Sequence, residues 1–169
     1  DGIVTTVMSN HGLEVFLNSK GLKVYRTNVG DRYVLEYMRQ NGFNLGGEQS
    51  GHIIMSDYSS TGDGIIAALK VLSIALTERK PISEITRAFK PVPQLLKNIQ
   101  IRGAQTFDEG KLRTISETAE KRIGKKGRVL IRKSGTEPVL RVMVESEDEV
   151  LMQKIVGDIS SELFGNDEQ

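Results

Sequence analysis

Two prolines stand within three residues in the stretch KPVPQ, at positions 90–94, and this feature constrains the fold most strongly. A helix cannot continue through such a stretch, because the residue before each proline is pushed toward an extended conformation. The stretch therefore predicts a domain boundary. It divides the 169-residue chain into residues 1–90 and residues 91–169.

The part before this boundary alternates strand patterns with helical patterns, which predicts a layered α/β domain. Residues 43–45 lead into a glycine-rich loop, and residues 52–57 leave it as a strand, so the loop is expected to lie between strands. The other expected strands are 2–8 and 22–27, and the expected helices follow Asn10, begin near Asp31, and cover 62–79 and 83–89.

The part after the boundary has a near-antiparallel pattern, which predicts a compact α+β unit. Ser146 followed by Glu149 has the form of a capping box, so the last helix is expected to begin there. The expected strands are 95–102, 127–132 and 138–145, and the expected helices are 109–123 and a last one with its apolar stripe at Leu151, Ile155, Ile159 and Leu163.

Composition excludes several classes of protein. The chain has no cysteine, so it forms no disulfide and no thiolate metal site. Its two histidines, His11 and His52, lie forty-one residues apart and do not have the spacing of zinc ligands. No apolar run approaches the ~20 residues that span a bilayer, and no secretory leader is recognisable. We expect a cytoplasmic protein with no membrane partner.

Charge is distributed unevenly, although the formal net charge is only +1. From Lys121 to Lys133 the chain carries seven basic residues and no acidic one. This basic run predicts a local anion site near residue 130. An alternative is a nucleic-acid-binding module that uses residues 121–133, but the run contains no aromatic residue on which a base could stack.

A loop with the sequence RKSGTEP, at 132–138, follows from this basic run. A phosphate group needs several donors that converge, and a glycine allows the backbone to approach closely. The two hydroxyl residues add donors, and each arginine presents parallel N–H groups to phosphate oxygens. The alternative is a surface hairpin with solvated arginines. The candidate phosphate-binding residues are Arg132, Ser134, Gly135, Thr136 and Arg141.

A second loop has the sequence GGEQSGH, at 46–52, and the opposite chemical character. Glu48 only accepts hydrogen bonds when it is ionised, whereas Ser50 and His52 can donate or accept. Such a set suits sugar hydroxyls or an amino group. A polar turn that binds nothing is the alternative. The candidate sugar-binding residues are Glu48, Ser50 and His52.

The two loops together, in this order and at this separation, resemble the sugar-binding and phosphate-binding loops of the α-D-phosphohexomutase superfamily. The sequences of both loops are most similar to those of the bacterial phosphoglucosamine mutase branch. The stretch TNVGDRYV, at 27–34, also resembles the segment that precedes the sugar loop in that branch. The resemblance covers essentially the whole chain.

This resemblance implies a fold for each part of the chain and assigns the family's motifs to particular domains. Residues 1–90 would be the third domain of that family, truncated at its N-terminus, with α/β/α layers and a mixed sheet. Residues 91–169 would be the fourth domain, a small TBP-like α+β domain whose antiparallel sheet carries two helices. The family's phosphoserine loop and its Mg²⁺-binding loop belong to the first two domains. The chain contains neither motif and begins at Asp1, so we expect a fragment, with a removed tag as the alternative.

The resemblance also implies roles and partners. The phosphate loop would hold the phosphate that is not reacting, while Glu48 and Ser50 would hold ring hydroxyls. His52 would either contact the substrate or brace the loop. The partners would be a hexosamine phosphate and the missing N-terminal domains, and not nucleic acid. Mg²⁺ would bind to a domain outside this chain, with none bound here.

We therefore expect no mutase activity from the chain alone, because phosphoryl transfer requires the serine and the metal. The complete enzyme would serve the synthesis of amino-sugar nucleotides and cell-wall precursors. Other readings are a fragment of a phosphomannomutase or phosphoglucomutase, or a complete small phosphosugar-binding protein. We expect Arg26 to be a cation at a strand end that faces solvent, and the resemblance offers the alternative of a basic residue that faces the active cleft. We expect Asp63 to begin a helix.

Overall fold

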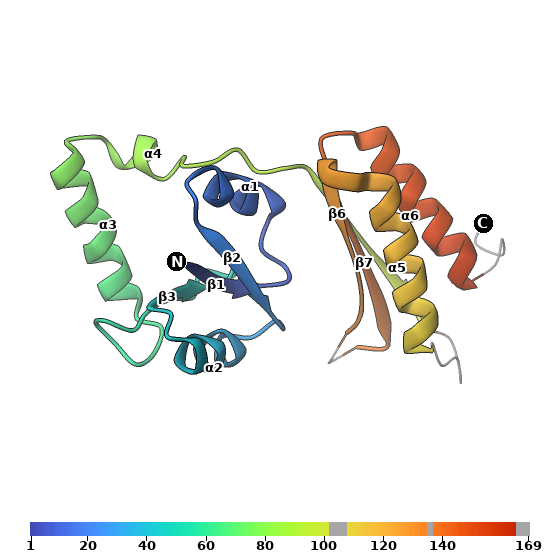
Figure 1. Cartoon of the computed structure of the whole chain (residues 1–169), viewed down its shortest axis with the longest axis horizontal. Coiled ribbons are helices and arrows are strands. Elements are labelled where there is room, and N and C mark those ends of the chain that lie inside the picture. Colours follow the sequence, from blue (N-terminus) through green and yellow to red (C-terminus); the bar gives the residue numbers. More distant parts are fainter. Residues whose placement is uncertain (102–107, 135–136, 165–169) are drawn as a thin grey trace. The chain divides into compact units, whose positions relative to one another are not determined.

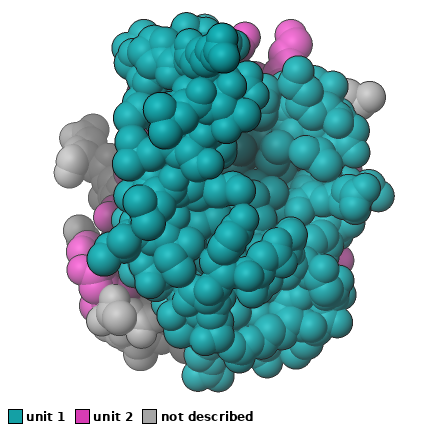
Figure 2. Space-filling model, turned by 90° about the vertical axis from the view of Figure 1, so that its left-hand side faces the viewer, with its two compact units in different colours: residues 1–91 teal, residues 92–169 magenta. Residues whose placement is uncertain are grey.

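The structure is a computed structural model that describes residues 1–101, 108–134 and 137–164. The chain forms two compact units, residues 1–91 and 92–169, shown in teal and magenta in Figure 2. The elements of the first unit are β1 (Gly2–Thr6), α1 (His11–Ser19), β2 (Lys23–Thr27), α2 (Asp31–Asn41), β3 (Leu45–Gly47), β4 (Ile53–Met55), α3 (Gly64–Glu78) and α4 (Ile82–Ile85). Those of the second are β5 (Gln94–Gln100), α5 (Glu109–Ile123), the 3₁₀ turn η1 (Gly124–Lys126), β6 (Gly127–Lys133), β7 (Val139–Ser146) and α6 (Glu149–Phe164).

The first unit contains a four-stranded sheet with the order β2-β1-β3-β4. Strand β1 is parallel to β2 and β3, whereas β4 is antiparallel to β3. The predicted mixed sheet is therefore confirmed. The three parallel strands end at the same edge of the sheet. The loops that follow them, at 7–10, 28–30 and 48–52, therefore lie at that edge.

Helices α1 and α2 lie on opposite sides of this sheet, as Figure 1 shows. Val34 and Met38 of α2 are buried against Val4 of β1 and Ile54 of β4, and these four side chains form the core of the unit. Gly42 ends the helix in the left-handed conformation that glycine adopts without strain.

Helix α3 forms where the sequence predicts it, but it buries no side chain completely. Asp63 caps its start by accepting hydrogen bonds from the backbone N–H groups of Ile65 and Ile66, at 2.9 and 3.0 Å. Its apolar residues nevertheless face solvent, and Leu76 is 80% exposed. A shorter helix, α4, covers only four residues instead of the expected 83–89, because the segment after Ile85 forms bends.

The second unit contains a three-stranded antiparallel sheet with the order β5-β7-β6, and α5 and α6 cover one face (Figure 1). The core of this unit is larger than that of the first unit, and the apolar stripe predicted for the last helix packs into it, with Leu151 only partly buried. This core consists of Ile99, Leu112, Ile115, Ala119, Ile123, Val129, Leu140, Val142, Val144, Met152, Ile155, Val156, Ile159 and Leu163. Since successive strand residues point to opposite faces, Arg141 lies on the other face of the sheet, between its register partners Arg132 and Asn98.

The start of α6 differs from the expected capping box at Ser146. Strand β7 continues to Ser146, which pairs with Gly127 of β6. Asp148 then caps the helix, because its carboxylate accepts a hydrogen bond from the N–H of Leu151 at 2.9 Å. The hydroxyl of Ser146 instead accepts from the N–H of Asp148, at 3.1 Å. Both residue types cap helices, and the strand pairing decides between them.

In the part of the chain that the structure describes, no helix combines the length and the hydrophobicity that a bilayer crossing requires.

Candidate functional site

The glycine-rich loop forms the tip of the hairpin between β3 and β4. The N–H of Glu48 donates to the carbonyl of His52 at 2.9 Å, and the N–H of Gly51 donates to the carbonyl of Glu48 at 3.1 Å. Gly51 has a φ of 103°, which side-chain-bearing residues rarely adopt. Gly46 is required for another reason, since a Cβ there would lie 2.5 Å from the sulfur of Met38.

The carboxylate of Glu48 is held from two sides. Its Oε1 accepts a hydrogen bond from the backbone N–H of Gly30, which precedes α2, at 2.8 Å. Its Oε2 lies 3.4 Å from Nδ1 of His52 and 3.5 Å from the hydroxyl of Ser50. The structure therefore brings the three predicted sugar-binding residues together. The Glu48 side chain is only 9% exposed, whereas that of His52 is 60% exposed.

A cavity of about 340 Å³ lies beside this loop, within the first unit. Its polar wall includes Glu48, Gln49 and His52, and its apolar wall includes Ile3 and Leu45. Acceptors on one side and apolar surface on the other suit a ring that carries hydroxyl groups on its edges.

Sequence reasoning missed Gly30 as part of this site. The residue has a φ of 132°, and its N–H reaches a carboxylate eighteen residues further along the chain. A glycine directly before a predicted helix was the available signal, but the partner of its N–H depends on the sheet order. The parallel pairing of β1 with both β2 and β3 brings the two loops to one edge.

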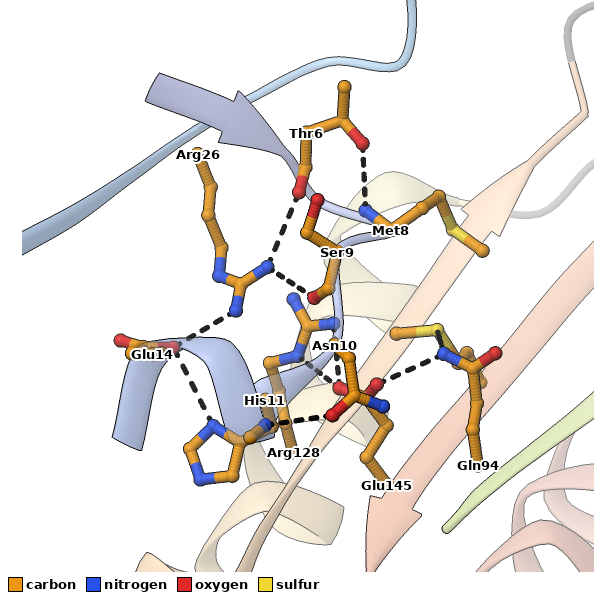
Figure 3. Close-up of polar contacts among 12 residues, drawn as sticks. Thr6, Met8, Ser9, Asn10, His11, Glu14, Arg26, Gln94, Arg128 and Glu145 are labelled. Atoms are coloured by element: carbon orange, nitrogen blue, oxygen red, sulfur yellow. Dashed lines mark hydrogen bonds and ion pairs between the residues drawn. The ribbon is translucent and has the colours of Figure 1, made fainter. Parts of the chain in front are cut away.

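The prediction for Arg26 is wrong, because its side chain is 15% exposed and bonded rather than facing solvent. As Figure 3 shows, its Nη1 donates to the carbonyls of Thr6 and Ser9, at 3.3 and 2.6 Å. Its Nη2 lies 3.1 Å from a carboxylate oxygen of Glu14. Arg26 therefore braces the loop that follows β1.

The second predicted loop connects β6 to β7 in the second unit. The N–H of Ser134 donates to the carbonyl of Val139 at 2.9 Å, and the hydroxyl of Ser134 accepts from the N–H of Glu137 at 3.3 Å. These bonds close the turn. Gly135 and Thr136, which we also predicted for this site, lie outside the described residues.

Arg132 and Arg141 are direct cross-strand partners, so their side chains leave the same face of the sheet. Among the described residues, neither buried Nε–H has a hydrogen-bond acceptor. Burial and the charge of Arg141 lower the pKa of the Arg132 guanidinium from its usual value. An anion bound next to the two guanidinium groups would reduce their mutual repulsion.

The same sheet face carries another charged group, further along the strands from Arg132. Figure 3 shows Glu145 of β7 between Arg128 and Gln94. The Nε and Nη2 of Arg128 lie 3.0 and 2.8 Å from one oxygen of Glu145, and the amide of Gln94 lies 3.0 Å from the other. The charge of Arg128 is thus neutralised by Glu145.

No group of three or more histidine or acidic side chains that could hold a metal ion occurs among residues 1–101, 108–134 and 137–164. The described residues therefore do not fit a Mg²⁺ site, and we derive no chemical step through a metal.

Comparisons with known proteins cover both units. Residues 1–92 match the family model described as "Phosphoglucomutase/phosphomannomutase, alpha/beta/alpha domain III". Residues 73–162 match the one described as "Phosphoglucomutase/phosphomannomutase, C-terminal domain".

Curated relatives and a solved structure agree with these matches. The phosphoglucosamine mutase of Brucella ovis is 53% identical over 158 residues, which are 94% of this chain and 35% of that protein. The phosphoglucosamine mutase of Bradyrhizobium diazoefficiens is 54% identical over 162 residues, 96% and 36% of the two chains. The chain thus spans about a third of the length of these relatives. The Aspergillus fumigatus N-acetylphosphoglucosamine mutase in complex with GlcNAc-6P and magnesium has the same fold, with a TM-score of 0.73, 19% identity, and coverage of 95% of this chain and 40% of that one.

Proposed function

Because the chain belongs to the phosphoglucomutase/phosphomannomutase family, we propose that it is the substrate-binding C-terminal part of a phosphoglucosamine mutase. Such an enzyme interconverts glucosamine 6-phosphate and glucosamine 1-phosphate. Residues 1–90 would be part of the family's third domain, and residues 91–169 its fourth. Relatives that are 53 to 54% identical along almost the whole chain and are named phosphoglucosamine mutases support this choice of substrate.

The observation that carries the proposal is the pair of facing arginines, Arg132 and Arg141. Their side chains leave one sheet face, and each has a buried Nε–H without an acceptor among the described residues. A phosphate dianion offers several acceptor oxygens to such donors. We assign the non-reacting phosphate of the substrate to these two side chains and to Ser134 at the start of the adjoining turn.

The sugar end of the substrate is assigned to Glu48 and Ser50. The Glu48 carboxylate accepts from Gly30 with one oxygen, and its other oxygen lies on the side of His52 and Ser50. That oxygen can accept a hydrogen bond from a ring hydroxyl or from the protonated amino group of glucosamine. The side chain of His52 is far more exposed than that of Glu48, and it has two open roles, contact with the sugar or support of Glu48.

Both assignments suit a reaction in which the phosphorylated end of the sugar changes. The reaction passes through a bisphosphorylated sugar that must turn over between two half-reactions. Each assigned group recognises a feature that both isomers carry, either a phosphate or ring hydroxyls. We assign binding and orientation to this chain and predict no turnover by the chain alone, because its sequence contains neither the family's phosphoserine motif nor its Mg²⁺-binding motif.

A mutase that acts on mannose or glucose phosphates is the competing function, because the family includes both. The carboxylate of Glu48 favours an amino sugar, since it can pair with an ammonium group as well as with a hydroxyl. Equal affinity of the chain for glucose 6-phosphate and glucosamine 6-phosphate would therefore support the competing function.

An NMR titration of the ¹⁵N-labelled chain with glucosamine 6-phosphate tests the proposal. The amide signals of residues 46–52 in the first unit and those of Arg132, Lys133 and Ser134 in the second unit are expected to shift. Absence of shifts in either loop would contradict the role assigned to that loop. A coupled assay with Mg²⁺ is the second arm, and measurable turnover by the chain would show that it is more than a binding part.

A further inference from the structure

Glu137 places a negatively charged carboxylate next to the proposed phosphate site. It is the only acidic residue between Glu120 and Glu145 in the sequence. It lies in the loop at 132–138, directly after the basic run. A carboxylate so close to a bound phosphate would repel it. The position of Glu137 therefore needs an explanation beyond the grip on phosphate.

The structure shows which group neutralises this carboxylate. One oxygen of Glu137 lies 2.8 Å from Nη2 of Arg141, four residues further along the hairpin. The Glu137 side chain is 57% exposed and that of Arg141 is 28% exposed, so the ion pair lies at the surface. Solvent-exposed pairs of this kind are weak, and another anion can therefore compete for the same guanidinium.

Arg132 has the opposite situation. It faces Arg141 across the two strands, and its buried Nε–H has no acceptor among the described residues. The two guanidinium groups repel each other, and a negative charge next to one of them reduces this repulsion. Glu137 supplies that charge when no phosphate is bound.

We propose that Glu137 is an internal counter-ion that occupies Arg141 until phosphate displaces it. Its carboxylate stabilises the pair of arginines in the unliganded chain and lowers the affinity of the site for phosphate. This inference rests on the proposed phosphate site. Weaker binding lets the phosphate leave the site. Such release is required because the sugar must turn over between two half-reactions.

Glu137 could instead orient Arg141 so that its other donors face the phosphate. The two roles predict opposite effects of a neutral substitution at Glu137 on the affinity for phosphate. Removal of a competitor tightens phosphate binding, whereas removal of a support weakens it. The sign of the change in affinity therefore separates them.

The experiment compares the chain with Glu137→Gln and with Glu120→Gln, by NMR titration with inorganic phosphate at low salt. Glu120 is exposed on α5, so its substitution changes the net charge equally without touching Arg141. Glu137→Gln is expected to tighten binding about two- to fivefold, as the strength of an exposed ion pair allows. Glu120→Gln is expected to leave affinity unchanged, and added salt should reduce the difference.

Arg141→Ala supplies the second comparison. If Glu137 competes for Arg141, Glu137→Gln gives no gain in the Arg141→Ala background. A gain of the same size there, or unchanged or weaker binding by Glu137→Gln alone, would overturn the inference while leaving the phosphate site standing. Absence of phosphate binding by the unaltered chain would overturn the proposed site itself, and this inference with it.

Discussion

The backbone N–H of Gly30 donates a hydrogen bond to Oε1 of Glu48, over 2.8 Å. This bond joins the loop before α2 to the loop after β3, and it sets the direction in which the carboxylate of Glu48 faces. The rigid edge of a parallel sheet thus positions a side chain that stands on an exposed turn. The binding of the sugar should therefore depend on a residue that does not touch it.

We expect Gly30→Ala to weaken the binding of glucosamine 6-phosphate about three- to tenfold. Alanine keeps the N–H, but the strained backbone would move it away from Oε1 of Glu48, and a typical hydrogen bond contributes about 0.5–1.5 kcal/mol. A Cβ at this position would lie 3.2 Å from the ring of Tyr33, and the φ of 132° disfavours any side chain. Binding of inorganic phosphate should not change. Gly21→Ala is the matched control, since Gly21 also has a positive φ but its Cβ would meet nothing. Equal losses for both variants would reduce Gly30 to a role in folding.

We expect Arg132→Gln to stabilise the unliganded chain slightly and to raise its melting temperature. The change in the free energy of unfolding should stay within about 0.5 kcal/mol, as is typical of surface substitutions. The lowered pKa of Arg132 means that the folded state disfavours its charge. This penalty is fully present below the folded-state pKa and disappears only as the pH rises through it. The gain in stability should thus be constant between about pH 5 and pH 9.

Calorimetry at several pH values measures this gain, and phosphate titration of the same variant should show that binding is lost. A lower melting temperature at all of these pH values would mean that the charge of Arg132 stabilises the unliganded unit, contrary to the geometry.

We expect Gly46→Ala to destabilise the first unit by about 1–3 kcal/mol, the usual cost of overpacking. The added Cβ would lie 2.5 Å from the sulfur of Met38 and 2.7 Å from Cγ1 of Val34. Urea unfolding measures the effect. Gly64→Ala, at the open start of α3, should be neutral or stabilising. Similar losses at both positions would show that Gly46 is not needed for packing.

We expect Leu69→Lys combined with Leu76→Lys to reduce self-association of the chain and its binding of an apolar dye. These side chains of α3 are 60 and 80% exposed, and contiguous exposed apolar surface promotes association. Light scattering and dye fluorescence measure the change. Val150→Lys on α6, where the residue is also 80% exposed but isolated, is the control and should have little effect. An equal effect of the control would point to net charge as the cause.

Local patterns predicted most of the elements correctly, because their signals lie within a few residues. Gly42 and Asp63 mark helix ends through conformational freedom and side-chain capping, and both do so in the structure. The apolar stripe of α6 is likewise visible as a helical period. The three sugar-loop candidates fall within a hairpin of five residues, so their proximity follows from local sequence.

Features that depend on distant partners could not be read in this way. Arg26 looked like a surface cation, because its partners, the carbonyls of Thr6 and Ser9, lie seventeen or more residues away. The choice of Asp148 over Ser146 as a helix cap depends on how far β7 pairs with β6. In each case strand pairing supplies the information that the local pattern lacks.

The central claim is that Glu48 of the first unit binds the sugar and that Arg132 of the second unit binds phosphate. The most direct test measures the affinity of Glu48→Gln and Arg132→Gln for glucosamine 6-phosphate and for inorganic phosphate. Glu48→Gln should weaken only the binding of the sugar phosphate, whereas Arg132→Gln should weaken both. If Glu48→Gln left the affinity for glucosamine 6-phosphate unchanged, or if Arg132→Gln left the affinity for inorganic phosphate unchanged, the role assigned to that residue would be wrong.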